Sequence, residues 1–148
     1  MRIVLQRVRS ASVSVADREI AAIGRGYLLL VGIEKTDTPV AGERLARKIA
    51  ALRLFPDAAG RMSLPLREVG GAVLVVSQFT LLADLARGNR PDFHRAAPPA
   101  TARTLYDAFL DQLRAALGPD APALQTGEFG ADMRIALVND GPVTLVLD

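Results

Sequence analysis

The sequence predicts a mixed α+β fold in which a largely antiparallel β-sheet, or small β-barrel, carries two main helices on one side. Three observations lead to this prediction. Strand-like segments fill both ends of the 148-residue chain, two helix-like segments interrupt them, and no repeat or linker is evident. Half of the residues are apolar and 23% are charged, a composition sufficient for one packed core at this length. We therefore expect residues 1–148 to form a single domain.

Four strands are expected near the start of the chain: Arg2–Val8, Ala11–Val15, Ile20–Ile23 and Tyr27–Ile33. We expect Arg9-Ser10 to turn the chain between the first two strands. The period of two in the first strand places Ile3, Leu5 and Arg7 on one face. The last of the four is a nearly continuous apolar run, which is typical of a central strand buried on both faces.

The first helix is predicted to begin at Asp37-Thr38-Pro39, because proline is favoured in the first turn of a helix. Its apolar face is expected to contain Val40, Ala41, Leu45, Ile49 and Leu52. A strand over Leu52–Phe55 and a loop over Pro56–Leu66 should follow. A second buried strand, Ala72–Val76, then leads directly into Ser77-Gln78-Phe79-Thr80.

The second half of the chain begins with the irregular segment Leu81–Ala100, and long loops of this kind in small domains are usually functional or disordered. Thr101 is expected to cap a helix that Gly118-Pro119 ends. Its apolar face should contain Leu105, Ala108, Phe109, Leu113 and Ala116. Three strands complete the chain: Ala123–Thr126, Asp132–Val138 and Val143–Leu147. From periodicity alone, Asn139-Asp140-Gly141-Pro142 is a hairpin turn between the last two strands.

The composition excludes several classes of chemistry. The chain has no cysteine and a single histidine, His94, so disulfides, thiol nucleophiles and multi-histidine metal sites are excluded. The acidic residues are scattered, and no glycine-rich phosphate loop is present. The net charge of +2 does not by itself indicate a nucleic-acid-binding protein. No segment is apolar for long enough to span a membrane or to act as a signal peptide, so a cytoplasmic location is expected.

The candidate chemical groups lie in two segments. Ser77 and Thr80 follow a buried strand, and ligand sites often lie at such strand ends. The spacing neither favours nor excludes a nucleophilic pair of Ser77 with His94, for which an exposed histidine is the more ordinary interpretation. Residues 139–144 form either a simple turn or a rigid backbone element that presents carbonyl groups to a ligand. The residues alone do not indicate a substrate.

Two motifs match the signature motifs of a known family as they stand: Ser77-Gln78-Phe79-Thr80-Leu81 and Asn139-Asp140-Gly141-Pro142-Val143-Thr144. Further segments, residues 1–8, 88–93, 96–99 and 127–133, are similar to other parts of the same family in the same order. The chain therefore resembles the D-aminoacyl-tRNA deacylase family along essentially its whole length. It departs from the usual family loop at Asn89 and Asp92, which make the loop less basic, and we leave both residues out of the site.

The resemblance implies a carboxylic ester hydrolase with the family's β-rich fold. Such an enzyme hydrolyses the ester between a D-amino acid, or glycine, and the 3′-terminal adenosine of tRNA, which provides chiral proofreading in translation and recycles tRNA. The resemblance also implies a homodimer that needs neither a metal nor an organic cofactor, with tRNA as its partner and no further protein partner. A noncatalytic nucleic-acid-binding module on the same scaffold is the alternative.

The resemblance further implies a role for each site residue. Backbone donors around Phe79 and Thr80 stabilise the developing oxyanion, while the 2′-hydroxyl of the tRNA assists in activating water. A second interpretation makes Thr80 a nucleophile. The side chains of Ser77 and Gln78 shape the amino-acid end of the pocket.

The remaining implied roles concern chirality and the adenine. Gly141-Pro142 is expected to be a cis pair, held by Arg7, that enters the partner's active site and excludes L side chains. Phe129 and Met133 resemble the residues that line the adenine pocket, and ordinary core positions are the other interpretation.

Overall fold

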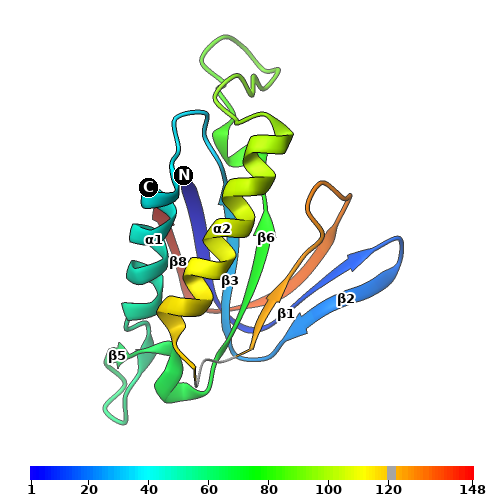
Figure 1. Ribbon diagram of the computed structural model, residues 1–148. Coiled ribbons are helices and arrows are strands. Elements are labelled where there is room, and N and C mark those ends of the chain that lie inside the picture. The colour runs from blue at the N-terminus through cyan, green and yellow to red at the C-terminus, as the bar shows by residue number, and fades with distance from the viewer. Residues whose placement is uncertain (120–122) are drawn as a thin grey trace.

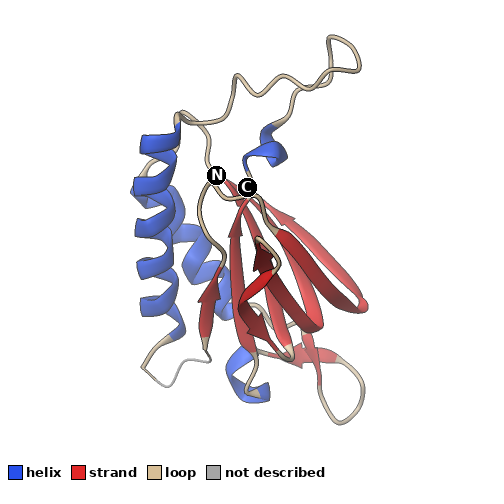
Figure 2. Cartoon of the chain, turned by 90° about the vertical axis from the view of Figure 1, so that its right-hand side faces the viewer, coloured by secondary structure: helices blue, strands red, loops and turns tan. Residues whose placement is uncertain are grey.

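The computed structural model describes residues 1–119 and 123–148, and it shows one curved sheet with two long helices packed against one face (Figures 1 and 2). The strands of this sheet follow the order β2-β1-β3-β6-β7, and β8 pairs with β1. The strands are β1 (Arg2–Val15), β2 (Arg18–Ile23), β3 (Gly26–Gly32), β6 (Ala72–Ser77), β7 (Leu124–Thr126) and β8 (Arg134–Leu147). The helices are α1 (Pro39–Ala51) and α2 (Pro99–Leu117).

The predicted α+β class is confirmed, and the sheet is mixed. The three pairings of β1, with β2, β3 and β8, are antiparallel, whereas β3–β6 and β6–β7 are parallel. Parallel neighbours need a long crossover, and the chain between β3 and β6 supplies it with α1, the small hairpin of β4 (Phe55–Pro56) and β5 (Met62–Leu64), and the 3-10 helix η1 (Leu66–Val69).

The prediction of a turn at Arg9-Ser10 was wrong. β1 runs without interruption through these residues, and its register with β8 shifts on either side of Val8, so the irregularity is a bulge rather than a turn. The predicted face was confirmed, because Ile3, Leu5 and Arg7 are all buried.

The main core lies between the sheet and the two helices. β3 is buried on both faces, as its apolar run predicts. α1 contributes Gly42, Leu45, Ala46 and Ile49, and α2 contributes Leu105, Tyr106, Phe109, Leu110 and Leu113. Val40 was predicted to face this core but is 72% exposed, because the buried positions of α1 follow the stripe that starts at Gly42.

Two elements near the helices differ from the sequence prediction. The strand expected over Leu52–Phe55 is reduced to β4, which pairs with β5 inside the segment predicted as a loop. α2 begins at Pro99 rather than after Thr101, because proline fits the first helical positions, where an N–H group has no intrahelical acceptor. The end of α2 at Gly118 was predicted correctly, whereas Ala108 and Ala116 are only half-buried.

The hairpin turn predicted at Asn139–Pro142 is absent. The two halves of β8 pair with two successive parts of β1 instead of with each other. Val8 lies opposite Asn139 and Gln6 lies opposite Thr144, so the four residues 140–143 face the single residue Arg7. The second signature motif is therefore an enlarged bulge, with four residues opposite one, in the middle of a long strand.

Two further findings concern classes of protein that the sequence analysis considered. No helix in the described part of the chain has the length and apolar character needed to cross a membrane. Residues 1–119 and 123–148 also contain no cluster of three or more His, Cys, Asp or Glu side chains arranged as metal ligands.

We predict that Gly26→Ala strongly destabilises the protein. A Cβ at Gly26 would overlap the Ala72 backbone at the point where β3 and β6 meet, and neither strand can move without breaking the parallel ladder. Such a clash should lower the free energy of unfolding by about 2–3 kcal/mol, as measured by urea denaturation. Gly24→Ala is the matched control, because a Cβ there has open space and should change stability by less than about 1 kcal/mol.

Candidate active site

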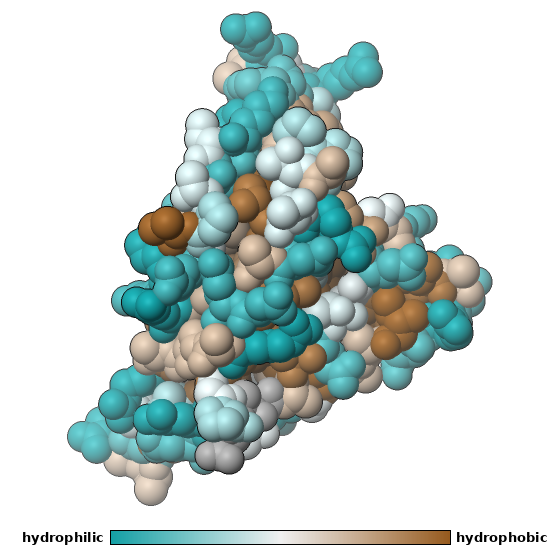
Figure 3. Space-filling view, viewed as in Figure 1, coloured by the Kyte–Doolittle hydropathy of each residue, from teal (hydrophilic) through white to brown (hydrophobic). Residues whose placement is uncertain are grey.

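A cavity of about 710 Å³ opens where β6 ends, and most of the side chains around it are apolar. Its walls come from the ends of β3 and β6, the segment that leads into α2, and the loop between β7 and β8. The outward face of α2, by contrast, is covered mainly by hydrophilic residues (Figure 3). A concave apolar pocket with a few polar groups is the usual form of a small-ligand site.

Five predicted site residues line this cavity: Ser77, Gln78, Phe79, Phe129 and Met133. Thr80 lies beside them, and its hydroxyl accepts a hydrogen bond from the side-chain amide of Gln78. Arg7, Gly141 and Pro142 do not line the cavity. The structure thus brings the first motif together with residues 129 and 133, and it keeps the second motif apart.

In the first motif, the backbone N–H groups of Phe79, which lines the cavity, and of the adjacent Thr80 have no acceptor in the described part of the chain. The N–H of Gln78 completes the sheet by donating to the Val31 carbonyl (2.8 Å), and the 3-10 helix η2 (Phe79–Leu82) then begins. The first N–H groups of such a turn have no acceptor inside it, and the side chain of Gln78 does not cap them. Phe79 and Thr80 therefore present amides that can donate to a negatively charged oxygen.

Two aromatic contacts hold the sides of the cavity. The Phe79 side chain is 57% exposed and packs edge-on against Phe93, with 4.9 Å between the ring centroids. Phe129 packs against Tyr106 at 5.7 Å, and the hydroxyl of Tyr106 donates to the Val75 carbonyl (3.1 Å). The half-buried Phe129 and Met133 both contact the core and both line the cavity, so each offers part of an apolar surface to a flat ligand.

The second motif is fastened to the body of the protein by Arg7. The buried guanidinium donates to the Asp140 carbonyl (3.2 Å), pairs with the Asp140 carboxylate (3.1 Å) and donates to the Leu54 carbonyl. A Cβ at Gly141, where φ is +125°, would lie 3.0 Å from Nη2 of Arg7. The peptide bond between Gly141 and Pro142 is cis, as the resemblance implies, and both residues are exposed.

Aromatic rings accommodate the buried charge of Arg7. Its guanidinium carbon lies 5.9 Å from the centre of the Phe55 ring, against which Tyr27 stacks at 5.3 Å with an interplanar angle of 16°. Burial raises the pKa of Tyr27 to about 12, because the phenolate form would lose its hydration. Tyr27 is therefore neutral at ordinary pH.

The two groups of residues lie at different ends of the sheet. Arg7 pairs with Tyr27 at the start of β3, whereas Ser77 pairs with Val31 near the end of β3. Tyr27 and Val31 are four residues apart along β3, which corresponds to roughly 13 Å. The bulge also lies in β8, which pairs with β1 at the edge of the sheet, so that β1 separates the bulge from β3 and β6.

The structure gives no support to a Ser77–His94 pair. His94 is exposed, does not line the cavity, and has Nδ1 3.2 Å from the Asp92 carboxylate. The backbone N–H of His94 donates to Asp92, which lowers the pKa of that carboxyl group. The individual contributions of Lys35, Phe93 and Tyr106 to the site were not predicted, although the long irregular segment that contains Phe93 was expected to be functional.

Comparison with known proteins identifies the class. A family model described as D-Tyr-tRNA(Tyr) deacylase matches residues 4–148, so the protein is a deacylase, a kind of hydrolase. The chain belongs to the D-Tyr-tRNA(Tyr) deacylase family.

Relatives cover the full chain. It is 56% identical to the D-aminoacyl-tRNA deacylase of Chloroflexus aurantiacus over 100% of this chain and 90% of the relative, and 52% identical to that of Saccharophagus degradans over 99% of each. A solved structure of a c-Myc DNA Unwinding Element Binding Protein is 44% identical, with a TM-score of 0.92 over 100% of this chain and 98% of that one. A probable eukaryotic D-amino acid tRNA deacylase, 20% identical, shares the fold with a TM-score of 0.84 over 99% and 97%.

We predict that ionisation of Tyr27 destabilises the folded protein at alkaline pH. Folding raises the pKa of Tyr27 from 10.0 to about 12, so the neutral phenol stabilises the folded protein. This stabilisation is fully present below pH 10 and is lost as the pH rises toward 12. The loss should be on the order of 1–2 kcal/mol. Denaturation curves between pH 9 and pH 12 should be flatter for Tyr27→Phe than for the unmodified protein. Equal slopes would contradict this prediction.

Proposed function

We propose that the protein hydrolyses the ester between a D-amino acid, or glycine, and the 3′-terminal adenosine of tRNA, and that it spares L-aminoacyl-tRNA. The observation that carries this proposal is the cavity at the end of β6. Free main-chain amides of the first motif lie at one part of it, and Phe129 and Met133 line another part. The full-length similarity to deacylases supports the same substrate. We place this chemistry in the cytoplasm, where it provides chiral proofreading and recycles tRNA.

The reaction needs little help from side chains, because an aminoacyl ester is already activated. Water adds to the ester carbonyl, the amides of Phe79 and Thr80 stabilise the oxyanion, and the bond to the 3′-oxygen then breaks, with the proton passing to that oxygen. The neighbouring 2′-hydroxyl of the substrate assists the water, and Ser77 and Gln78 shape the amino-acid end. The Thr80 hydroxyl accepts a hydrogen bond from Gln78 and contacts no general base in the described residues, which supports water as the nucleophile.

Discrimination between D- and L-amino acids is assigned to the bulge at Gly141-Pro142. We infer that Arg7 holds this bulge so that it enters the cavity of a second copy and occupies the space that an L side chain would need. The exposed position of the bulge, at the other end of the sheet from its own cavity, supports this arrangement. A few kcal/mol of steric conflict suffices, because about 1.4 kcal/mol gives a tenfold preference.

The same arrangement requires a homodimer. β8 is an edge strand, and its large apolar side chains Leu137, Val138 and Val146 are 38%, 53% and 61% exposed. An unpaired strand edge with exposed apolar side chains is a surface on which another chain can pair. A second copy that covers β8 would also carry the bulge toward its partner.

We predict that the purified protein releases tyrosine from D-Tyr-tRNA at least a hundredfold faster than from L-Tyr-tRNA, and that it sediments as a dimer. Release of labelled amino acid over time measures the first quantity. Equal release from the two substrates, or full activity in a strict monomer, would contradict the proposal. Binding of tRNA without release would favour the noncatalytic nucleic-acid-binding module, an alternative consistent with the DNA-binding name of the 44% identical structure.

We predict that Thr80→Ala lowers kcat about tenfold without abolishing turnover, because the main-chain amides remain when the hydroxyl is removed. Single-turnover hydrolysis of D-Tyr-tRNA measures the effect. Thr104→Ala serves as the control, since the hydroxyl of Thr104 bonds only within α2. Complete loss of hydrolysis by Thr80→Ala, with substrate binding intact, would show that Thr80 is the nucleophile.

A further inference from the structure

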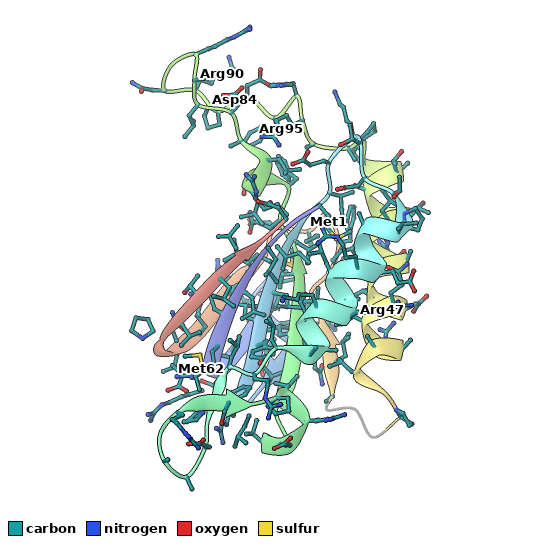
Figure 4. The ribbon with its side chains drawn as sticks, turned by 90° about the vertical axis from the view of Figure 1, so that its left-hand side faces the viewer. Met1, Arg47, Met62, Asp84, Arg90 and Arg95 are labelled. Carbon is teal, nitrogen blue, oxygen red and sulfur yellow. The ribbon has the colours of Figure 1, made fainter. Side chains whose placement is uncertain are left out.

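The irregular segment before α2 forms a loop that projects from the molecule (Figures 1 and 4), and the residues that follow the projection line the cavity. Its base is closed by two backbone hydrogen bonds between Asp84 and Asp92, of 2.7 and 3.0 Å. Immediately after this base, Phe93 packs against Phe79 and lines the cavity. The loop is thus attached to the wall of the site.

The acidic groups of this loop are occupied by its own backbone. One carboxylate oxygen of Asp84 accepts the N–H of Ala86 (2.9 Å), and Asp92 accepts the N–H of His94 (2.8 Å). Arg87 and Arg90 are exposed, and within residues 1–119 and 123–148 neither makes a side-chain hydrogen bond or ion pair. The outer part of the loop therefore presents two positive charges, while the two carboxylates lie at its base, where the N–H of His94 and, to a smaller extent, the nearby Arg87 lower the pKa of the Asp92 carboxyl group.

A third positive charge lies at the cavity itself. Of the described residues that line it, Lys35 is the one basic residue, and the one acidic residue, Asp132, comes from the loop between β7 and β8. The backbone N–H of Lys35 donates to the Arg95 carbonyl (3.0 Å), which joins this side of the cavity to the base of the projecting loop. Arg95 itself is neutralised by Glu34 (2.7 Å).

We propose that Lys35, Arg87 and Arg90 bind the phosphodiester backbone of the nucleotides that precede the terminal adenosine. This inference rests on the proposed function, because it takes the terminal nucleotide to occupy the cavity. Arg90 lies three residues before Phe93, so its backbone stands at most roughly 10 Å from the cavity wall. A stacked strand advances about 3.4 Å per phosphate, so this distance spans the next few phosphates. Such contacts give affinity without reading sequence.

The test compares two substrates: D-Tyr-tRNA, and D-tyrosyl-adenosine, which lacks the preceding phosphates. For Arg87→Ala/Arg90→Ala, we expect kcat/KM on D-Tyr-tRNA to fall roughly tenfold, mainly through KM, with hydrolysis of D-tyrosyl-adenosine unchanged. For Lys35→Ala, which changes the cavity wall, we expect weaker binding of uncharged tRNA. A plot of the logarithm of tRNA affinity against the logarithm of salt concentration should have a slope near −2 for three phosphate contacts. In the double variant, which keeps one contact, the slope should be about −0.7.

Arg67→Ala and Lys48→Ala are the matched controls. Both residues are exposed basic residues outside the cavity, and neither has an ion-pair partner in the described part of the chain. They should leave both substrates unaffected. Arg87→Lys/Arg90→Lys should retain most of the tRNA activity, because the charge remains.

Two results would overturn the proposal: an equal loss on both substrates, or no loss on D-Tyr-tRNA. Binding of uncharged tRNA, followed by fluorescence anisotropy, tests the loop separately from catalysis. If the unmodified protein released no amino acid, the proposed function would fail, yet weaker tRNA binding by the loop variants would still support these phosphate contacts. Unchanged binding would overturn them.

Discussion

The buried guanidinium of Arg7 joins three parts of the chain that are far apart in sequence. It extends from β1, contacts the Leu54 carbonyl just before β4, and holds Asp140 in the bulge of β8. A charge in this position is tolerated only because a carboxylate, two carbonyl groups and the Phe55 ring replace the water that it has lost. The contacts of Arg7 therefore position the second motif together with the ladder between β1 and β8 and a contact of Arg9 with the Asp140 carboxylate.

Sequence periodicity correctly predicted the elements whose pattern of burial stays the same along their whole length. β3 is buried on both faces, β6 lies next to it, and α2 keeps one apolar face, so local patterns were sufficient for all three. The continuous course of β1 and the bulge in β8 were missed for a common reason. Each depends on pairing with the other strand, more than 120 residues away, and a glycine–proline pair looks locally like a turn.

The candidate site was predicted residue by residue from the family motifs, not from chemistry. Periodicity placed Ser77 at a strand end and Arg7 on the buried face. It could not show that Phe129 lies at the same cavity as Ser77, because the 3-10 turn and the loop after β7 meet only in three dimensions. The contributions of Tyr106 and Lys35 gave no local signal, since a buried tyrosine and a surface lysine are ordinary residues.

The bulge in β8 divides that strand into two arms, each of which is in register with its own part of β1. Substitutions along either arm leave the backbone ladder intact, whereas removal of one residue would turn every following side chain to the opposite face. The pairing with β1 therefore constrains the number of residues in each arm of β8 more tightly than it constrains which residues they are. We therefore expect an insertion or deletion in either arm to disturb the sheet more than a single substitution of an exposed side chain does.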